Sequence, residues 1–276
     1  MAKEKIPTGI ESNSGQIEFS KINQDFSATQ HGHQLAGGVR YDRYKPSNMK
    51  NIEWERLLGV DVNNLKHLQL TYGLTRQFIK YSEEAKLTLQ EQEDLLLAAI
   101  VHDWAEAIVG DKSYDLKTAS QEDTEFQELK KMLGDIYGQN DSGLLARINH
   151  VTDTIIKDRN TKLGKIFNTV ERVGYLRTGL FAWQKSKENG GDLKTGLEWL
   201  TNNVFLNQIS TLIEYSKIYP AVTMYLKEKK DFINDAFNNL PDDVFKKYTP
   251  EEVDKQKSKF ELGKKDWQEY YQKLSL

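Results

Sequence analysis

Apolar residues recur every three or four positions along most of this chain, and this helical periodicity limits the fold more than any other feature of the sequence. Between about 162 and 183, for example, Leu163, Ile166, Phe167 and Val170 mark one face of a helix. The same pattern begins near 61 and recurs at about 89–109, 121–137, 142–157, 195–218 and after Thr249. No pair of alternating segments is joined by a hairpin turn. The sequence therefore predicts an all-α fold.

Particular residues predict where helices and regions begin and end. Thr88 followed by Glu91 predicts a capping box, and Gly110 predicts the end of the same helix. The first part of the chain is polar and lacks a lasting apolar period, which predicts an extension of loops and partly ordered segments. The segment SKENGGDLK, residues 186–194, is the best candidate for a linker. We therefore divide the chain into a polar N-terminal extension, a helical domain and a helical C-terminal extension, at 1–54, 55–185 and 186–276.

Charge and composition argue against several classes of function. The chain carries 38 basic and 41 acidic side chains, so its net charge of −3 provides no overall attraction to nucleic acid or to an anionic membrane. No run approaches the roughly 18 apolar residues of a membrane span, and the N-terminus lacks the apolar core of a signal peptide. We therefore expect a cytoplasmic protein that binds neither nucleic acid nor membrane. Because the sequence has no cysteine, any metal must be held by His, Asp, Glu or backbone oxygen.

One apolar segment, AAIVHDWAEAIVGD at residues 98–111, contains more charge than a buried helix normally tolerates. On a continuous helix, His102 and Glu106 lie on consecutive turns of one stripe, with Asp103 beside them. Burying unpaired charges costs several kcal/mol per ion, so a partner must neutralise them. A bound divalent cation would do so directly. Imidazole nitrogen together with carboxylate oxygen suits Zn, Mn, Fe, Co or Ni better than calcium.

This segment and the residues around it resemble the HD superfamily of metal-dependent phosphohydrolases. That family has a histidine on one helix, an adjacent His-Asp pair on the next and a distant aspartate; His67, His102 and Asp103 match the first three. The stretch HDWAEAIVGDKSYDLK is similar to the 5′-deoxynucleotidase branch, which carries HDxxExxxGD and a downstream Lys. The resemblance covers roughly residues 55–185. Where the family has its last aspartate, commonly in ADRL, this chain has NTVERVGYL, so the fourth ligand would be Glu171.

The resemblance implies one divalent metal ion, drawn from Mn, Co, Ni, Zn, Fe and Mg. Two-metal members add two more histidines before the final acidic ligand, whereas His150 is the only histidine in that interval here, which favours a single ion. Such an ion polarises a phosphoryl oxygen and lowers the pKa of a bound water from about 15.7 to about 7 in the best zinc cases. The implied ligands are His67, His102, Asp103 and Glu171.

The resemblance also implies roles for residues that follow the His-Asp pair. Glu106 would accept the proton of the attacking water and return it to the leaving oxygen, while Asp111 would hold a substrate hydroxyl or orient that water. Lys117, helped by Lys112, would neutralise the phosphate. The alternative for Glu106 is a structural ion pair with a Lys or Arg of a neighbouring helix.

The function implied is removal of the 5′-phosphate from a (deoxy)nucleoside monophosphate, and a homodimer is compatible with the family and with the apolar C-terminal helices. A first alternative keeps the site but hydrolyses a nucleoside triphosphate or an alarmone, which requires more cationic groups nearby. A second alternative is a catalytically silent HD module that binds a nucleotide or a protein partner, and Glu171 in place of the usual aspartate favours it. The cations that the first alternative would have to bring together are Arg40, Arg56, Lys157 and Arg159.

Overall fold

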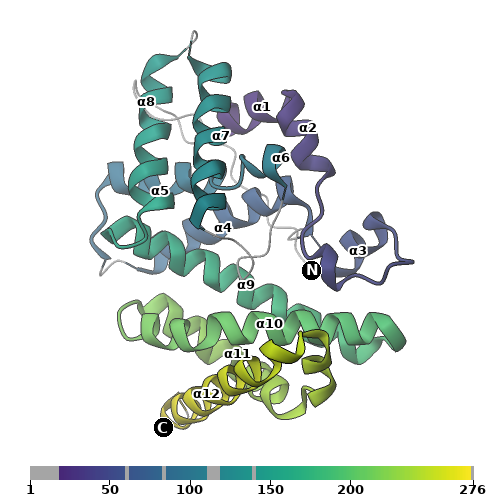
Figure 1. The fold of residues 1–276 in the computed structure, drawn as a ribbon. Helices are drawn as coiled ribbons and strands as arrows, with labels where there is room; N and C mark the ends of the chain where they lie inside the picture. Colours follow the sequence, from purple (N-terminus) through teal and green to yellow (C-terminus); the bar gives the residue numbers. More distant parts are fainter. Residues whose placement is uncertain (1–18, 60–61, 83–84, 111–118, 139–140, 275–276) are drawn as a thin grey trace, which may run out of the picture.

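The computed structural model describes residues 19–59, 62–82, 85–110, 119–138 and 141–274. Within these ranges the chain forms helices and no β-strand, so the all-α fold that the sequence predicts is confirmed (Figure 1). The α-helices are α1 (Phe19–Ser27), α2 (Gln30–Gly37), α3 (Asn51–Leu58), α4 (Asn64–Tyr81), α5 (Leu89–Val101), α6 (Glu106–Val109), α7 (Ala119–Tyr137), α8 (Ser142–Val151), α9 (Lys162–Glu188), α10 (Gly191–Ser216), α11 (Pro220–Asn239) and α12 (Pro250–Leu274). Shorter helices of other types are the 3₁₀ turns η1 (Asp42–Tyr44) and η6 (Asp242–Lys247) and the π-helical turn η5 (Thr152–Lys157).

The two long helices α9 and α10 pack against each other across the middle of the molecule (Figure 1). Helices α4, α5, α7 and α8 lie on one side of this pair, and α11 and α12 lie on the other. Trp183 of α9, Leu200 of α10, Leu95 of α5 and Trp267 of α12 are all buried in one continuous hydrophobic core. The C-terminal helices therefore share a core with the rest of the chain. None of the described helices is both long enough and apolar enough to cross a membrane.

The predicted helix ends around the charged segment are confirmed. The Thr88 hydroxyl accepts a hydrogen bond from the Glu91 amide at 3.2 Å, and the Glu91 carboxylate accepts one from the Thr88 amide at 2.8 Å. This reciprocal pair satisfies amide groups that the first turn of α5 leaves without helical partners. Gly110 follows α6 with φ +78°, a left-handed conformation that a side chain would strain. Both ends of the segment are thus fixed by local chemistry.

The N-terminal region is more ordered than the sequence predicts. Helices α1, α2 and the start of α3 lie within it, and Ile22, Phe26 and Leu35 are buried. The expectation of loops was therefore wrong from residue 19 onward. These helices contain only eight or nine residues, so each buries one or two large side chains and shows no lasting period. Helices this short are stabilised by tertiary packing, which a local pattern does not reveal.

Three further segments differ from the prediction. The predicted linker, 186–194, is mostly helical, because α9 continues to Glu188 and α10 begins at Gly191, whose φ of +57° allows the chain to turn sharply. α10 ends at Ser216, and Pro220 lies in the first turn of α11, a helix that the sequence does not predict. The predicted helix 142–157 changes from α to π geometry at Thr152. In the first two cases helical order extends further than the Gly and Pro residues there suggest, and in the third only the type of helix differs.

Gly196 allows α10 to pass close to the backbone of η1, and we expect Gly196→Ala to lower the free energy of unfolding by about 1–3 kcal/mol. A Cβ at this position would lie 2.0 Å from the carbonyl oxygen of Tyr44, so the two elements would have to separate. Gly134→Ala is the matched control, because a Cβ at this helical position would meet no atom within 4 Å.

Urea denaturation followed by circular dichroism would measure both changes. We expect Gly134→Ala to raise the free energy of unfolding by up to about 1 kcal/mol, since alanine has the higher helix propensity. A similar gain in stability for Gly196→Ala would show that α10 and η1 are not held this closely.

Candidate metal centre

The segment predicted as one helix over 89–109 is interrupted at the charged residues. α5 ends at Val101, and the backbone hydrogen bonds then join residues three apart, from the Trp104 amide to Val101 at 3.2 Å and from the Glu106 amide to Asp103 at 3.0 Å. Such 3₁₀-type bonds advance the chain by about 120° per residue instead of about 100°. The prediction of one continuous stripe was therefore wrong, although the charged residues still meet.

The packing of three successive side chains explains this interruption. His102 and Trp104 are buried, and the Asp103 side chain is only 14% exposed. Trp104 stacks on Phe26 of α1, with ring centroids 3.9 Å apart and an interplanar angle of 7°. Asp103 instead contacts Arg40, which comes from a different part of the chain. Tertiary contacts in several directions thus replace the regular helix at this point.

Two histidines and an aspartate form a compact group of possible metal ligands. The His102 Nε2 atom lies 3.3 Å from His67 Nε2 and 3.2 Å from Asp103 Oδ2, and the last two atoms are 3.5 Å apart. Donor atoms about 2.0–2.1 Å from a tetrahedral ion lie about 3.3 Å from each other. The spacing and chemistry of these three donors fit one ion, so the buried group of His67, His102 and Asp103 could hold a metal.

A local hydrogen bond aims the His102 imidazole at the centre, and a helix cap precedes His67. The His102 Nδ1 atom lies 3.1 Å from the carbonyl oxygen of Ala99, which can only accept, so Nδ1 carries hydrogen and the neutral ring presents the Nε2 lone pair. His67 lies near the start of α4, where the Asn63 side chain accepts a hydrogen bond from the Lys66 amide at 3.1 Å. Asn63 thus caps α4 and fixes the start of the helix that carries His67.

Glu106 and Glu171 place two more carboxylates beside the three donors. Glu171, on α9, has its Oε1 atom 4.0 Å from His102 Nε2, and its side chain is 15% exposed. Glu106 is buried, and its Oε2 atom accepts a hydrogen bond from Asn64 Nδ2 at 3.1 Å. The structure therefore brings three of the four predicted ligands into one compact group, and Glu171 and the predicted proton acceptor Glu106 lie beside it.

Arg40 is a buried cation at this centre, and the sequence analysis named it only as one of four cations for a triphosphate substrate. Its Nη1 atom lies 2.7 Å from Asp103 Oδ2 and 4.0 Å from Glu106 Oε2. The backbone next to it is held by an antiparallel bridge between Val39 and Asn63 and by a hydrogen bond from the Arg40 amide to Val62 at 2.8 Å. This pairing fixes the guanidinium against the carboxylates.

Tyr175 is a further residue of the centre that the sequence analysis missed. Its hydroxyl accepts a long hydrogen bond from Arg40 Nη2 at 3.5 Å, and its ring lies 5.9 Å from the guanidinium carbon. Burial raises the pKa of Tyr175, so the phenol keeps its proton at physiological pH. The spacing from Glu171 to Tyr175, one helical turn on α9, is the signal that points to this residue.

The charges of the centre change the acidity of its members. Burial by itself lowers the pKa of His102, but the carboxylates of Asp103 and Glu171 outweigh burial, and the pKa rises above its ordinary value of 6.5. Burial by itself would raise the pKa of Asp103, yet the charges of His102, Arg40 and His67 hold it well below its usual range. A proton and a metal ion therefore compete for the same imidazole.

We expect the metal affinity of the protein to increase with pH. A metal ion must displace any proton on His102, whose pKa is raised, so affinity should rise by up to about tenfold per pH unit below that pKa and level off above it. Competition with a chromophoric chelator for Co²⁺ between pH 5.5 and 8.5 would measure this. An affinity independent of pH over that interval would exclude His102 as a ligand.

Metal-free protein provides the control, because its stability should decrease with pH where the metal affinity increases. The pKa of His102 is higher in the folded protein than in the unfolded chain, so protonation of His102 stabilises the fold. This stabilisation is fully present below the pKa of the unfolded chain, and it is lost as the pH rises through the pKa of the folded protein. The lowered pKa of Asp103 adds stability that disappears only as pH falls through that lowered value. Denaturation in chelator should thus lose the His102 contribution over the interval in which metal affinity increases.

The remaining predicted site residues are not placed at the centre by the structure. Asp111, Lys112 and Lys117 lie outside the described residues. His150 is exposed on α8. Lys157, one of the cations required by a triphosphate substrate, forms an ion pair with Asp123 of α7 at 3.1 Å.

Comparisons of the chain with protein-family models, with curated proteins and with solved structures found no match. The function must therefore be argued from the chemistry of the centre and from the residues that resemble the HD superfamily.

Proposed function

We propose that this protein is a metal-dependent phosphohydrolase that removes the 5′-phosphate from (deoxy)nucleoside monophosphates. The observation that carries the proposal is the convergence of His67, His102 and Asp103, whose donor atoms lie 3.2–3.5 Å apart although they come from α4 and from the turn that follows α5. These are the residues in which the sequence resembles the HD superfamily. Geometry and sequence pattern support the same ligands by separate routes.

In this proposal His67, His102, Asp103 and Glu171 hold one divalent ion. When bound, such an ion supplies Lewis acidity toward a phosphoryl oxygen and lowers the pKa of a nearby water. Glu171 is one methylene longer than the aspartate of the family, and its position 4.0 Å from His102 supports the substitution of one acid for the other.

Glu106 serves in this proposal as the general base and acid. Its carboxylate accepts the proton of the attacking water and later returns it to the leaving nucleoside oxygen. The Asn64 amide donates a hydrogen bond to Glu106 Oε2 at 3.1 Å and holds the carboxylate beside the three candidate ligands. Arg40 Nη1 lies 4.0 Å from the same oxygen, so the neighbours of Glu106 include one neutral amide and one cation.

Arg40 provides positive charge for the substrate phosphate. Its guanidinium has five donors in a planar fork, which matches a phosphate as well as it matches the carboxylate of Asp103. Arg40 contacts the centre, whereas Lys157 is held by Asp123 of α7, and this distribution favours a monophosphate over the triphosphate alternative.

A second candidate function is a catalytically silent module that binds a nucleotide or a protein partner. The contact that favours it is the ion pair between Arg40 and Asp103, which already neutralises part of the negative charge without a metal. The two functions differ in what added metal does, since a silent module would release no phosphate.

The proposal predicts phosphate release that requires metal. We would strip the protein with chelator, restore Mn, Co, Ni, Zn or Mg one at a time, and follow phosphate from nucleoside mono-, di- and triphosphates. We expect release from monophosphates with at least one metal and none in chelator. Preference for triphosphates would favour the first alternative, and metal binding without turnover of any nucleotide would favour the silent module.

A further inference from the structure

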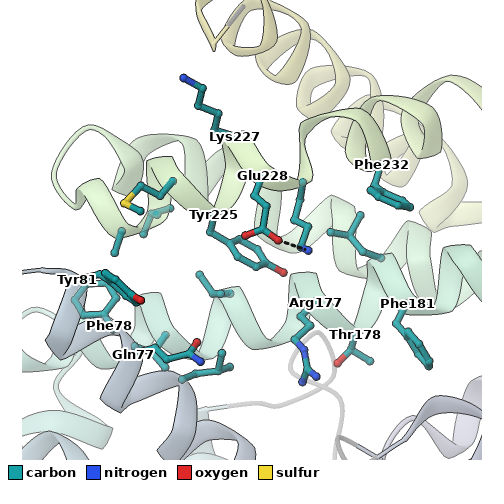
Figure 2. A pocket seen from close by; sticks show the side chains of 18 of the residues that line it. Gln77, Phe78, Tyr81, Arg177, Thr178, Phe181, Tyr225, Lys227, Glu228 and Phe232 are labelled. Atoms are coloured by element: carbon teal, nitrogen blue, oxygen red, sulfur yellow. Dashed lines mark hydrogen bonds and ion pairs between the residues drawn. The ribbon is translucent and has the colours of Figure 1, made fainter. Parts of the chain in front are cut away.

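A cavity of about 960 Å³ lies between α4, α9 and α11, and Glu171 is not part of its lining (Figure 2). Tyr81 lies toward one end of the labelled lining and Phe181 and Phe232 toward the other, with Arg177 and Tyr225 between them. The volume falls within the range of about 300–1,000 Å³ that small-molecule sites occupy. This cavity is separate from the proposed function and would exist without it.

The lining gathers large apolar side chains that are exposed to water. Tyr81 is 51% exposed, Phe181 36%, Met224 58% and Phe232 52%, and all four border the cavity. Several large apolar side chains exposed around one cavity favour a binding site, because leaving them in water is unfavourable. An occupant with an apolar chain or ring would cover these side chains.

The polar groups at the centre of the cavity favour a negatively charged occupant. Glu228, an acid in the lining, is engaged by Lys229 at 2.7 Å, whereas the Arg177 guanidinium forms no ion pair with the described residues. The Tyr225 hydroxyl is shielded from solvent and has no hydrogen-bond partner among the described residues, which is costly for a buried donor. Burial also raises the pKa of Tyr225, so the hydroxyl keeps the proton that it would donate.

We propose that this cavity binds one molecule of an amphiphilic anion, with its acidic group beside Arg177 and Tyr225 and its apolar body along the groove between α9 and α11. The exposed Arg177 guanidinium would supply charge-assisted hydrogen bonds to the acidic oxygens, and the shielded Tyr225 phenol would add a donor once the side chains that cover it move aside. The aromatic side chains at the two ends would limit the length of the apolar body. Carboxylate and phosphate headgroups share this chemistry.

Binding of straight-chain carboxylates to the full-length protein tests this proposal. Isothermal titration of octanoate, decanoate and dodecanoate, below the concentrations at which they form micelles, should give one site per chain. Each added pair of methylenes should tighten binding by up to about tenfold while the chain still fits. Decyl phosphate compared with decanoate distinguishes the two headgroups, and decan-1-ol should bind about fivefold more weakly than either.

Paired variants locate the bound molecule. Arg177→Gln should remove the preference for decanoate over decan-1-ol, whereas Arg76→Gln, an exposed arginine of α4 outside the lining, should not. Phe232→Ser should weaken decanoate and decan-1-ol alike, and Leu262→Ser is its control, because Leu262 is 58% exposed on α12.

Three results would overturn the proposal. The first is binding that does not saturate at one molecule per chain. The second is an equal affinity for decanoate and decyltrimethylammonium, because Arg177 should reject the cation. The third is a dimer, detected by light scattering, that Phe232→Ser dissociates; the cavity would then be an interface with a second copy of the chain.

Discussion

His102→Ala is expected to abolish stoichiometric metal binding and to lower metal-dependent phosphate release by more than about a hundredfold. His102 Nε2 lies within 3.3 Å of His67 Nε2 and Asp103 Oδ2, so its loss removes the donor that lies next to both. Loss of a residue that only supports a ligand already costs about 10–100-fold in affinity or activity, and loss of the ligand should cost more. Metal content after dialysis and phosphate release would both be measured.

A matched histidine controls for the substitution itself. His150→Ala removes an exposed imidazole of α8 and should leave metal content and activity as in the unchanged protein. Thermal unfolding adds a readout that does not need the substrate. Metal at about 100 times its Kd should stabilise the unchanged protein by about 2.7 kcal/mol but should not stabilise the His102 variant. Full metal content in His102→Ala would show that the ion is held elsewhere.

The sequence predicts those parts of the centre whose residues are close in sequence, and it does not predict those that tertiary contacts bring together. His102 and Asp103 are neighbours in sequence, and Glu106 follows within one turn, so their proximity is visible in the motif even though the helix there is interrupted. Arg40 and Asp103 are 63 positions apart. Their contact depends on the bridge at Val39, a single pairing without any period that a sequence pattern could reveal.

The same distinction separates the helices that the sequence predicts from those it does not. α9 repeats apolar residues over many turns, and its buried face includes Ile166, Phe167 and Val170. α1 buries only Ile22 and Phe26, and Phe26 stacks on Trp104, which lies far from it in sequence. Periodicity detects burial that is repeated along a helix, whereas a few contacts with distant residues produce no periodic pattern in the sequence.

Glu106→Gln is expected to lower phosphate release by about 10²–10⁴-fold while leaving metal content unchanged. The change keeps the shape of the side chain and an oxygen that can accept the hydrogen bond from Asn64, but it removes the group that takes the proton from water. The rate of release and the metal content, measured together, separate loss of proton transfer from loss of the ion. Glu198→Gln, at another buried glutamate on α10, is the control and should change neither.

The structural alternative for Glu106 makes a different prediction for the same variant. Glu106 Oε2 lies 4.0 Å from Arg40 Nη1, so the carboxylate could serve to balance a buried guanidinium. Removing one member of a buried charge pair destabilises the fold by about 3–5 kcal/mol, because the remaining charge loses its partner. In that case Glu106→Gln would lower the free energy of unfolding by a comparable amount and leave turnover per folded molecule intact. If Glu106 transfers the proton, we expect the opposite result: Glu106→Gln loses turnover and keeps its stability. Stability is kept because Asp103, 2.7 Å from Arg40, still balances the charge of the arginine.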